Sequence, residues 1–252
     1  MPGMHVARDD NDSQPSPVSG RFGLPPEMNT TLDPTRHAAP QVVEALRAAI
    51  ISLELAPGSA LDRGVLAQSF GVSQTPVRDA LMRLSEEGLV LIRAQYTTQV
   101  SRIDVPAARE AHFLRRSIEI EIARLLALSH DQAVIDDLRT QLSRQAGLAA
   151  SKDYPAFIAA DKEFHRLMYV AAGLPRLWSV VTRMSGHIDR LRLLHAPAQG
   201  KAESILAGHL TILEAIDSGD AEVAQQAVRE HLSGTLASVD EIQQRYPEYL
   251  IL

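Results

Sequence analysis

The sequence predicts a mostly α-helical protein in which an N-terminal winged helix-turn-helix is followed by a C-terminal all-helical bundle. Three observations support this fold class. Residues 57–84 contain two short helical patterns on either side of a tight turn at Gly71-Val72-Ser73. Beyond about residue 104, long segments with helical spacing of apolar residues end at Gly, Pro or capping residues. Hydrophobic residues make up 45% of the chain but aromatic residues only 4%, which favours close-packed helices over sheet.

Composition excludes several classes of protein and site. The 252 residues include no cysteine, so disulfides, thiolate metal sites and cysteine nucleophiles are excluded. We find no run of about 18 apolar residues and no charged-then-apolar leader, so we expect no membrane span, no secretion signal and a cytoplasmic location. The net charge of −6 argues against a protein that coats nucleic acid by bulk electrostatics. Any affinity for DNA must therefore come from side chains placed on one face.

We divide the chain into four parts. Residues 1–36 are rich in Pro, Ser, Asp and Gly and lack apolar periodicity, so we expect a disordered tail. Residues 37–102 form the winged helix-turn-helix, with a first helix over 40–54 and a β-hairpin wing of strands over 88–92 and 97–100. Residues 103–240 form the helical domain, and residues 241–252 a C-terminal tail. Within the helical domain we expect helices over 104–129, 131–151, 153–172, 175–195, 201–218 and 220–239.

The second helix of the helix-turn-helix has the features of a recognition helix. Such a helix enters the major groove with its N-terminal residues, so its first turn must carry hydrogen-bonding groups. Here that turn supplies Ser73, Gln74, Thr75 and Arg78. Ser73 can cap the helix or bind a phosphate, and we keep both interpretations. The pattern predicts binding to double-stranded DNA.

Three histidines and one aspartate are candidates for a metal site. Asp161 and His165 lie four residues apart, so their side chains share one helix face, and His209 and His231 lie near apolar positions of two later helices. Three imidazoles and one carboxylate that converge inside a bundle suit a divalent transition metal such as Zn, Mn or Ni. The alternative is that these histidines are hydrogen-bonded core residues and that the Asp/His pair is a surface contact.

Together the two regions resemble the GntR superfamily of bacterial transcription regulators, in the FadR-like branch with an FCD effector domain. The resemblance spans about residues 38–240. Its N-terminal part consists of Pro57-Gly58, Leu66-Ala67, residues 71–81 (GVSQTPVRDAL), Leu84 and residues 87–90 (EGLV). Its C-terminal part consists of residues 114–119 (LRRSIE), residues 161–165 (DKEFH), His209 and His231-Leu232.

The resemblance implies a homodimer that binds a palindromic operator and a small organic acid that changes operator affinity. It assigns contacts with DNA to Arg63, Ser73, Gln74, Thr75 and Arg78, and metal ligation to Asp161, His165, His209 and His231. The chain departs from the family in two ways. Gln74 stands where many relatives have arginine, which shifts the expected base preference toward adenine, and the wing lacks a glycine near Thr97, which argues against insertion of the wing into the minor groove.

An arginine is the expected partner of an effector carboxylate, because its planar fork binds two oxygens at once. By resemblance Arg115 takes this role, with Arg116 as the adjacent choice and Arg190 or Arg192 as a second choice. The alternative for these arginines is salt bridging with Glu119, Glu121 or Asp189.

These observations favour a ligand-responsive DNA-binding regulator, with repression as the usual outcome in relatives. Two alternatives stay open. One is a metal-dependent enzyme with a DNA-binding appendage, for which we find no general base beside the metal candidates, because Glu163 points to another helix face. The other is a constitutive repressor whose metal is purely structural. The length of the helical domain and its inward polar groups favour the regulator.

Overall fold

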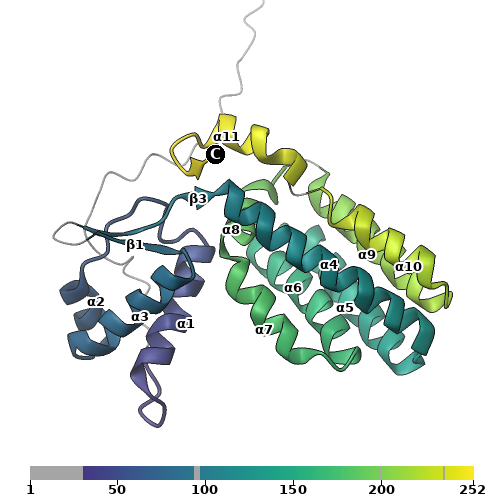
Figure 1. Cartoon of the computed structure of the whole chain (residues 1–252), viewed down its shortest axis with the longest axis horizontal. Helices are drawn as coiled ribbons and strands as arrows, with labels where there is room; N and C mark the ends of the chain where they lie inside the picture. Colours follow the sequence, from purple (N-terminus) through teal and green to yellow (C-terminus); the bar gives the residue numbers. More distant parts are fainter. Residues whose placement is uncertain (1–30, 94–96, 199, 235) are drawn as a thin grey trace, which may run out of the picture.

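The computed structural model describes residues 31–93, 97–198, 200–234 and 236–252. In this part of the chain, a small winged-helix domain is joined to a larger helical domain (Figure 1). The predicted fold class is confirmed. The first 30 residues of the expected N-terminal tail and the tip of the wing, 94–96, lie outside the described residues. Among the described residues, no helix combines the length and the apolar character that a membrane span requires.

The winged-helix domain consists of three helices and a hairpin that share one core. The helices are α1 (Ala38–Ile51), α2 (Arg63–Phe70) and α3 (Gln74–Glu86). Strands β1 (Val90–Ile92) and β2 (Thr98–Val100) pair antiparallel and form the wing. The core contains Leu46, Ile50, Leu66, Val77, Leu81 and Leu84, which are at most 2% exposed. These apolar residues recur at helical spacing in the sequence, and their burial fixes which face of α3 remains outside.

Local signals explain the geometry of the helix-turn-helix. The Asp62 carboxylate accepts a hydrogen bond from the backbone N–H of Val65 (2.8 Å) and so caps α2. Gly71 ends α2 at a φ of 64°, in the left-handed region that glycine enters without steric cost. Ser73 occupies the N-cap position of α3, but its side chain makes no capping hydrogen bond within the described residues. The capping interpretation of Ser73 was therefore wrong.

The helical domain begins with the long α4 (Val105–Ser129), which packs against most of the other helices. It continues with α5 (Gln132–Ala150), α6 (Tyr154–Ala171), α7 (Pro175–Met184), α8 (Gly186–His195), α9 (Lys201–Asp217), α10 (Ala221–His231) and α11 (Val239–Arg245). Helices α4, α5, α6 and α10 each begin after an aspartate that caps the first turn: Asp104, Asp131, Asp153 and Asp220. Because these caps are local, the starts of these helices were predictable from sequence.

Three expectations for the helical domain were wrong. The segment 175–195 is two helices rather than one, since the chain bends at Ser185 between α7 and α8. The expected helix over 220–239 ends at His231, and a short 3-10 helix (Leu236–Ser238) separates it from α11. The expected tail 241–252 contains the end of α11 and a strand, β4 (Leu250–Ile251), which pairs in parallel with β3 (Ile103–Asp104).

Burial of apolar surface explains why the C-terminal segment is ordered. Val239, Ile242 and Leu250 are buried in one cluster with Ile103 and with Leu191 of α8. Tyr246 and Tyr249 pack against the same cluster. The C-terminal segment therefore covers the connection between the two domains, where Figure 1 shows α11 and β3 close together.

Candidate metal centre and DNA-binding face

The structure brings the four proposed metal ligands together. Asp161 and His165 come from α6, His209 from α9, and His231 from the last position of α10. One ligand atom from each residue lies within 4.8 Å of the others. Asp161, His165 and His209 are buried, and His231 is partly buried. The cluster thus lies inside the helical domain, with one side closer to solvent.

The distances between these atoms suit a shared ion. His165 Nε2 lies 3.2 Å from His209 Nε2 and 3.3 Å from His231 Nε2, and Asp161 Oδ1 lies 3.4 Å from His209 Nε2. Two ligand atoms about 2.1 Å from an ion, at an angle of about 90–110°, lie roughly 3.0–3.4 Å apart. The observed separations fall in this range.

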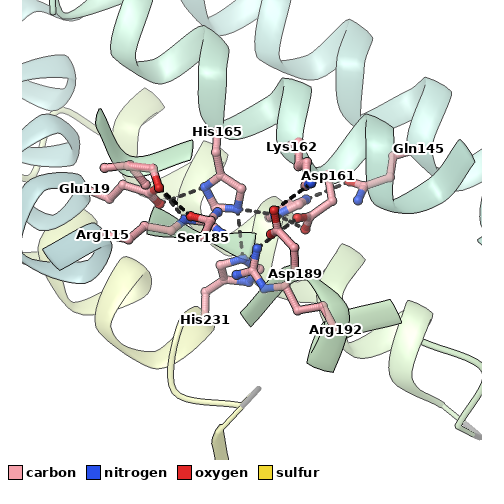
Figure 2. A network of polar contacts seen from close by, with 12 residues as sticks. Arg115, Glu119, Gln145, Asp161, Lys162, His165, Ser185, Asp189, Arg192 and His231 are labelled. Carbon is pink, nitrogen blue, oxygen red and sulfur yellow. Dashed lines mark hydrogen bonds and ion pairs between the residues drawn. The ribbon is translucent and has the colours of Figure 1, made fainter. Parts of the chain in front are cut away.

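Two polar side chains lie against the other nitrogens of these imidazoles, and the one at His209 forms a hydrogen bond. Glu119 Oε2 on α4 lies 2.8 Å from His165 Nδ1, and Gln145 Oε1 on α5 accepts a hydrogen bond from His209 Nδ1 (2.7 Å). These contacts favour a proton on Nδ1 and leave the Nε2 lone pairs directed at one another. Figure 2 shows His165 at the centre of this network.

Sequence reasoning missed both of these residues as parts of the site. Glu119 was considered only as a salt-bridge partner of an arginine. One signal was available in the sequence, namely that both residues lie on buried helix faces. Glu119 follows Arg115 by one helical turn, and Gln145 shares a face with the buried Leu138 and Gln141. A polar residue on an apolar helix face needs a partner, because an unpaired buried polar group is costly.

Burial sets the charge state of the cluster. It lowers the pKa of His209 and of His231 to about 3, and lowers the pKa of His165 well below its ordinary value. Burial by itself would raise the pKa of Asp161, but Arg192 and the neighbouring imidazoles hold that pKa below its ordinary value. At neutral pH the cluster therefore offers three neutral imidazoles and a carboxylate, which is the protonation state that metal ligands need.

A glycine allows α9 and α10 to approach at this point. A Cβ atom on Gly208 would lie 2.4 Å from His231 Nδ1 and 3.2 Å from its Cγ. Real Cβ contacts are essentially never that short. Because the imidazole ring is rigid, any side chain at Gly208 would displace His231 from the cluster.

The structure places the candidate effector arginines in two different regions. Arg115 points inward, and its Nε donates a hydrogen bond to Glu119 Oε1 (2.6 Å) while its Nη2 is buried without a hydrogen-bond partner among the described residues. Arg192 of α8 lies 3.6 Å from Asp161 Oδ2, and its Nη1 is likewise buried and unpartnered among the described residues. Arg190 does not reach this centre: its Nη1 donates to the backbone carbonyl of Ser101 at the domain junction (2.7 Å). The structure therefore does not bring Arg190, the second choice for the effector carboxylate, to the cluster that holds Arg115 and Arg192.

The residues expected to contact DNA share the outer face of the helix-turn-helix. Arg63 begins α2, Ser73 precedes α3, and Gln74, Thr75 and Arg78 lie in its first turns. All five are exposed. Arg78 forms a surface ion pair with Asp79 (3.4 Å), a type of pair that contributes little to stability and is easily exchanged for a phosphate or base.

Comparison with known proteins decides the family. A model described as bacterial regulatory proteins, gntR family, matches residues 38–100, and a model of the FCD domain matches residues 110–234. The chain belongs to the GntR family. It is a transcription regulator with a DNA-binding helix-turn-helix and an FCD domain, and it is not an enzyme. The resemblance inferred from the sequence is confirmed, and the enzyme alternative is excluded.

Relatives match the GntR-family chain over most of its length. An HTH-type transcriptional regulator in an unstable DNA locus of Streptomyces ambofaciens is 36% identical over 81% of this chain and 85% of its own. The HTH-type transcriptional repressor RspR of Escherichia coli is 29% identical over 88% of this chain and 97% of its own. The solved structure of E. coli McbR/YncC covers 84% of this chain and 99% of its own with a TM-score of 0.69, and at 19% identity it shows the fold alone.

Proposed function

We propose that this GntR-family regulator binds a palindromic operator as a homodimer, and that a divalent transition metal and a small organic carboxylate in its FCD domain change its affinity for the operator. The observation that carries the proposal is the convergence of Asp161 Oδ1 with the Nε2 atoms of His165, His209 and His231. A DNA-binding domain joined to a buried cluster of this kind is suited to regulation by a ligand.

The residues of the cluster fit a metal ion on the chemistry of their donors. Gln145 accepts the Nδ1 proton of His209, Glu119 Oε2 lies 2.8 Å from His165 Nδ1 without a hydrogen bond, and the Nε2 atoms of His165 and His209 lie 3.2 Å apart. Two unprotonated Nε2 atoms at this distance repel each other unless a cation is shared. Zn, Mn and Ni all accept imidazole nitrogen and carboxylate oxygen. A bound ion of this class would act as a Lewis acid toward an oxygen of the effector.

Two arginines supply the recognition of a carboxylate. Arg115 Nη2 and Arg192 Nη1 are buried guanidinium donors that lack a hydrogen-bond partner among the described residues. Arg115 is ion-paired with Glu119 and Arg192 with Asp161, but these two nitrogens keep unused hydrogen-bond donors. A small anion that accepts both hydrogen bonds would satisfy these donors, which favours a carboxylate effector over a purely structural metal site.

In the winged-helix domain, α3 carries the groups that we propose bind the operator. Its exposed N-terminal turn combines the positive end of the helix dipole with Ser73, Gln74 and Thr75, while Arg78 follows one turn later. We propose that Arg63 and Ser73 bind phosphates and that Gln74, Thr75 and Arg78 face the bases. RspR is named a repressor, and we propose repression here as well. Because a bacterial regulator of this family acts on DNA, we propose the cytoplasm as its site of action.

Metal analysis combined with operator binding tests the proposal. We expect purified protein to bind about one Zn²⁺, Mn²⁺ or Ni²⁺ per chain, and a thermal-shift screen to identify organic acids that raise Tm only when the metal is present. His231→Asn should abolish both effects. His130→Asn is the matched control, because His130 is an exposed imidazole outside the cluster in a left-handed C-cap position that asparagine tolerates.

The same acids must change the affinity for an operator selected from random DNA. If the acids raise Tm in the presence of metal but do not change operator affinity, the metal site is structural and the proposed regulatory role is contradicted. Failure to select any palindromic sequence would contradict the DNA-binding part of the proposal.

A further inference from the structure

The connection between the two domains is held by α8. Arg190 is completely buried, and its Nη1 donates to the backbone carbonyl of Ser101 (2.7 Å) while its Nε donates to the carbonyl of Gly186 in its own helix (3.2 Å). His187 Nδ1 accepts hydrogen bonds from the backbone N–H of Asp104 (3.0 Å) and from Arg190 Nη2 (2.9 Å). Two adjacent turns of α8 therefore bind both ends of the linker, residues 101–104.

The start of α8 also touches the winged-helix domain directly. A Cβ atom on Gly186 would lie 2.6 Å from Leu89 Cδ2, so only glycine permits the present distance. Across the same contact, Gly88 adopts a φ of 73°, and a Cβ there would lie 3.0 Å from His187 Nε2. The two domains therefore meet at a glycine on each side, where the fit has little tolerance for change.

The C-terminal segment holds the linker from another side. Strand β4 pairs in parallel with β3 inside the linker, and the backbone N–H of Ile103 donates to the carbonyl of Tyr249 (2.7 Å). Leu250 is buried against Ile103, and the nearby Ile188 of α8 belongs to the same cluster. This segment lies beyond residue 234, where the match to the FCD domain ends.

The same helix α8 reaches the metal and effector centre with its other face. The buried Asp189 forms an ion pair with the partly exposed Lys162 of α6 (2.7 Å), and Lys162 is the neighbour of Asp161 in sequence. Arg192 lies 3.6 Å from Asp161 Oδ2. Arg190 thus contacts the linker, and Arg192, two residues later on the same helix, lies beside the centre, where Figure 2 shows it near Asp161. Figure 1 shows α8 between the two domains, and it contacts both α1 and α6.

Space is available for the winged helix to change its angle. A groove of about 1180 Å³ lies between the wing and the helical domain. Leu91 lines it on the wing side, and Met184 and Ile251 line it on the other side. These three apolar side chains are each at least 37% exposed, so a closer approach of the domains would bury apolar surface.

We propose that α8 and β4 form a clamp on the linker that sets the angle of the winged helix according to the state of the metal and effector centre. Movement of Arg192 and Asp189 toward or away from α6 displaces α8, and Arg190 and His187 pass that displacement to the linker. Strand β4 holds the linker from the opposite side, so that the linker is fixed between two elements. The inference rests on the proposed function, because it explains how that centre acts on DNA binding.

Distance measurement between the domains tests the clamp. The chain has no cysteine, so Gln68→Cys on α2 and Ser143→Cys on α5, both exposed, introduce one pair of spin-label sites. Labelled chains are diluted with unlabelled chains, and the distance distribution is recorded with EDTA and with Zn²⁺ as the probe. Deletion of residues 249–252 removes β4, and deletion of Leu252 alone is the matched control that leaves β4 intact.

We expect Zn²⁺ to shift the distribution in the wild type and in the Leu252 deletion. In the chain that lacks residues 249–252, Zn²⁺ binding should persist while the shift is lost. Arg190→Gln, which removes the donor to Ser101, should lose the shift in the same way and decides the matter if the truncated chain fails to fold. If both variants show the same Zn²⁺-dependent change in the distance distribution as the wild type, the clamp is refuted. It is also refuted if the wild type binds Zn²⁺ without any change in the distribution.

Failure of the proposed function gives different results. A wild type that binds no Zn²⁺ refutes the metal centre, and with it the signal that the clamp would carry. If the chain shows the Zn²⁺-dependent change in distance but selects no operator, the clamp is supported and the proposed binding to an operator is refuted.

Discussion

The proposed DNA-binding face and the proposed metal centre are built in opposite ways. The face takes its five polar residues from one short stretch of chain, residues 63–78, and exposes all of them. The centre takes four ligands from three helices that span residues 161–231, and it buries three of the four. An exposed face tolerates change in any one residue without loss of the fold, whereas the centre depends on the packing of every helix that contributes to it.

Removing one exposed contact should have the largest effect on function with the smallest effect on structure. We expect Arg78→Ala to weaken operator binding by about 2–6 kcal/mol, because the proposed homodimer would lose two contacts of about 1–3 kcal/mol each. A gel-shift titration at fixed salt measures this loss. Sedimentation should show an unchanged dimer.

Arg83→Ala is the matched control for Arg78→Ala. Arg83 is exposed on the same helix but lies in its last turn, away from the N-terminal end that enters the groove. An equal loss of affinity in both variants would indicate a general charge effect rather than a placed contact.

Local patterns explain why the DNA-binding face was predictable. The caps, the glycine turn and the apolar spacing of the helix-turn-helix all lie within about one helical turn of the residues they control. For the centre, the sequence indicated the four ligands but not what supports them. Glu119 and Gln145 lie on other helices, and no local pattern links either residue to a histidine 46 or 64 positions away. The break at Ser185 and the strand at Leu250 are equally non-local, because contacts with the linker fix them.

A glycine tests how strongly the centre depends on helix packing. We expect Gly208→Ala to lower metal affinity by more than about 100-fold, as loss of a ligand would, because the new Cβ displaces the His231 ring. Competition with a metal indicator measures this affinity. Gly147→Ala on α5 is the control, since its Cβ would meet nothing within 4 Å, and it should leave metal binding unchanged and slightly increase stability. Wild-type affinity in Gly208→Ala would contradict the placement of His231.

The support of His165 should show a smaller effect. Glu119→Gln keeps the shape of the side chain but removes the charge that lies 2.8 Å from His165 Nδ1. We expect metal affinity to fall by about 10–100-fold, the usual cost of losing a contact behind a ligand. Glu121→Gln is the control, because Glu121 is an exposed residue of the same helix that pairs with Arg124. If Glu119→Gln and Glu121→Gln bind the metal with equal affinity, Glu119 does not support His165 as a metal ligand.

The domain junction differs from both regions, because its buried histidine, His187, has no proposed metal or effector to bind, so its titration in metal-free protein changes the stability of the fold. Burial, followed by the charge of Arg190, lowers the pKa of His187 to about 4. The unfolded chain has the higher value, about 6.5, so on acidification it takes up the proton before the folded chain does. The stability that neutral His187 contributes is therefore complete above about pH 6.5 and is lost as the pH falls toward about 4.

We expect this contribution to be on the order of 2 kcal/mol in metal-free protein, smaller than the full shift implies because His187 is not fully enclosed. Urea unfolding of the wild type and of His187→Asn at several pH values between 7 and 4 measures it. His165, His209 and His231 add to the slope in both proteins, since their pKa values are also lowered, so the difference between the two slopes isolates His187. Identical slopes would show that His187 is not held neutral at the junction, and the tight contact between α8 and the linker would then be looser than the distances to Asp104 and Arg190 imply.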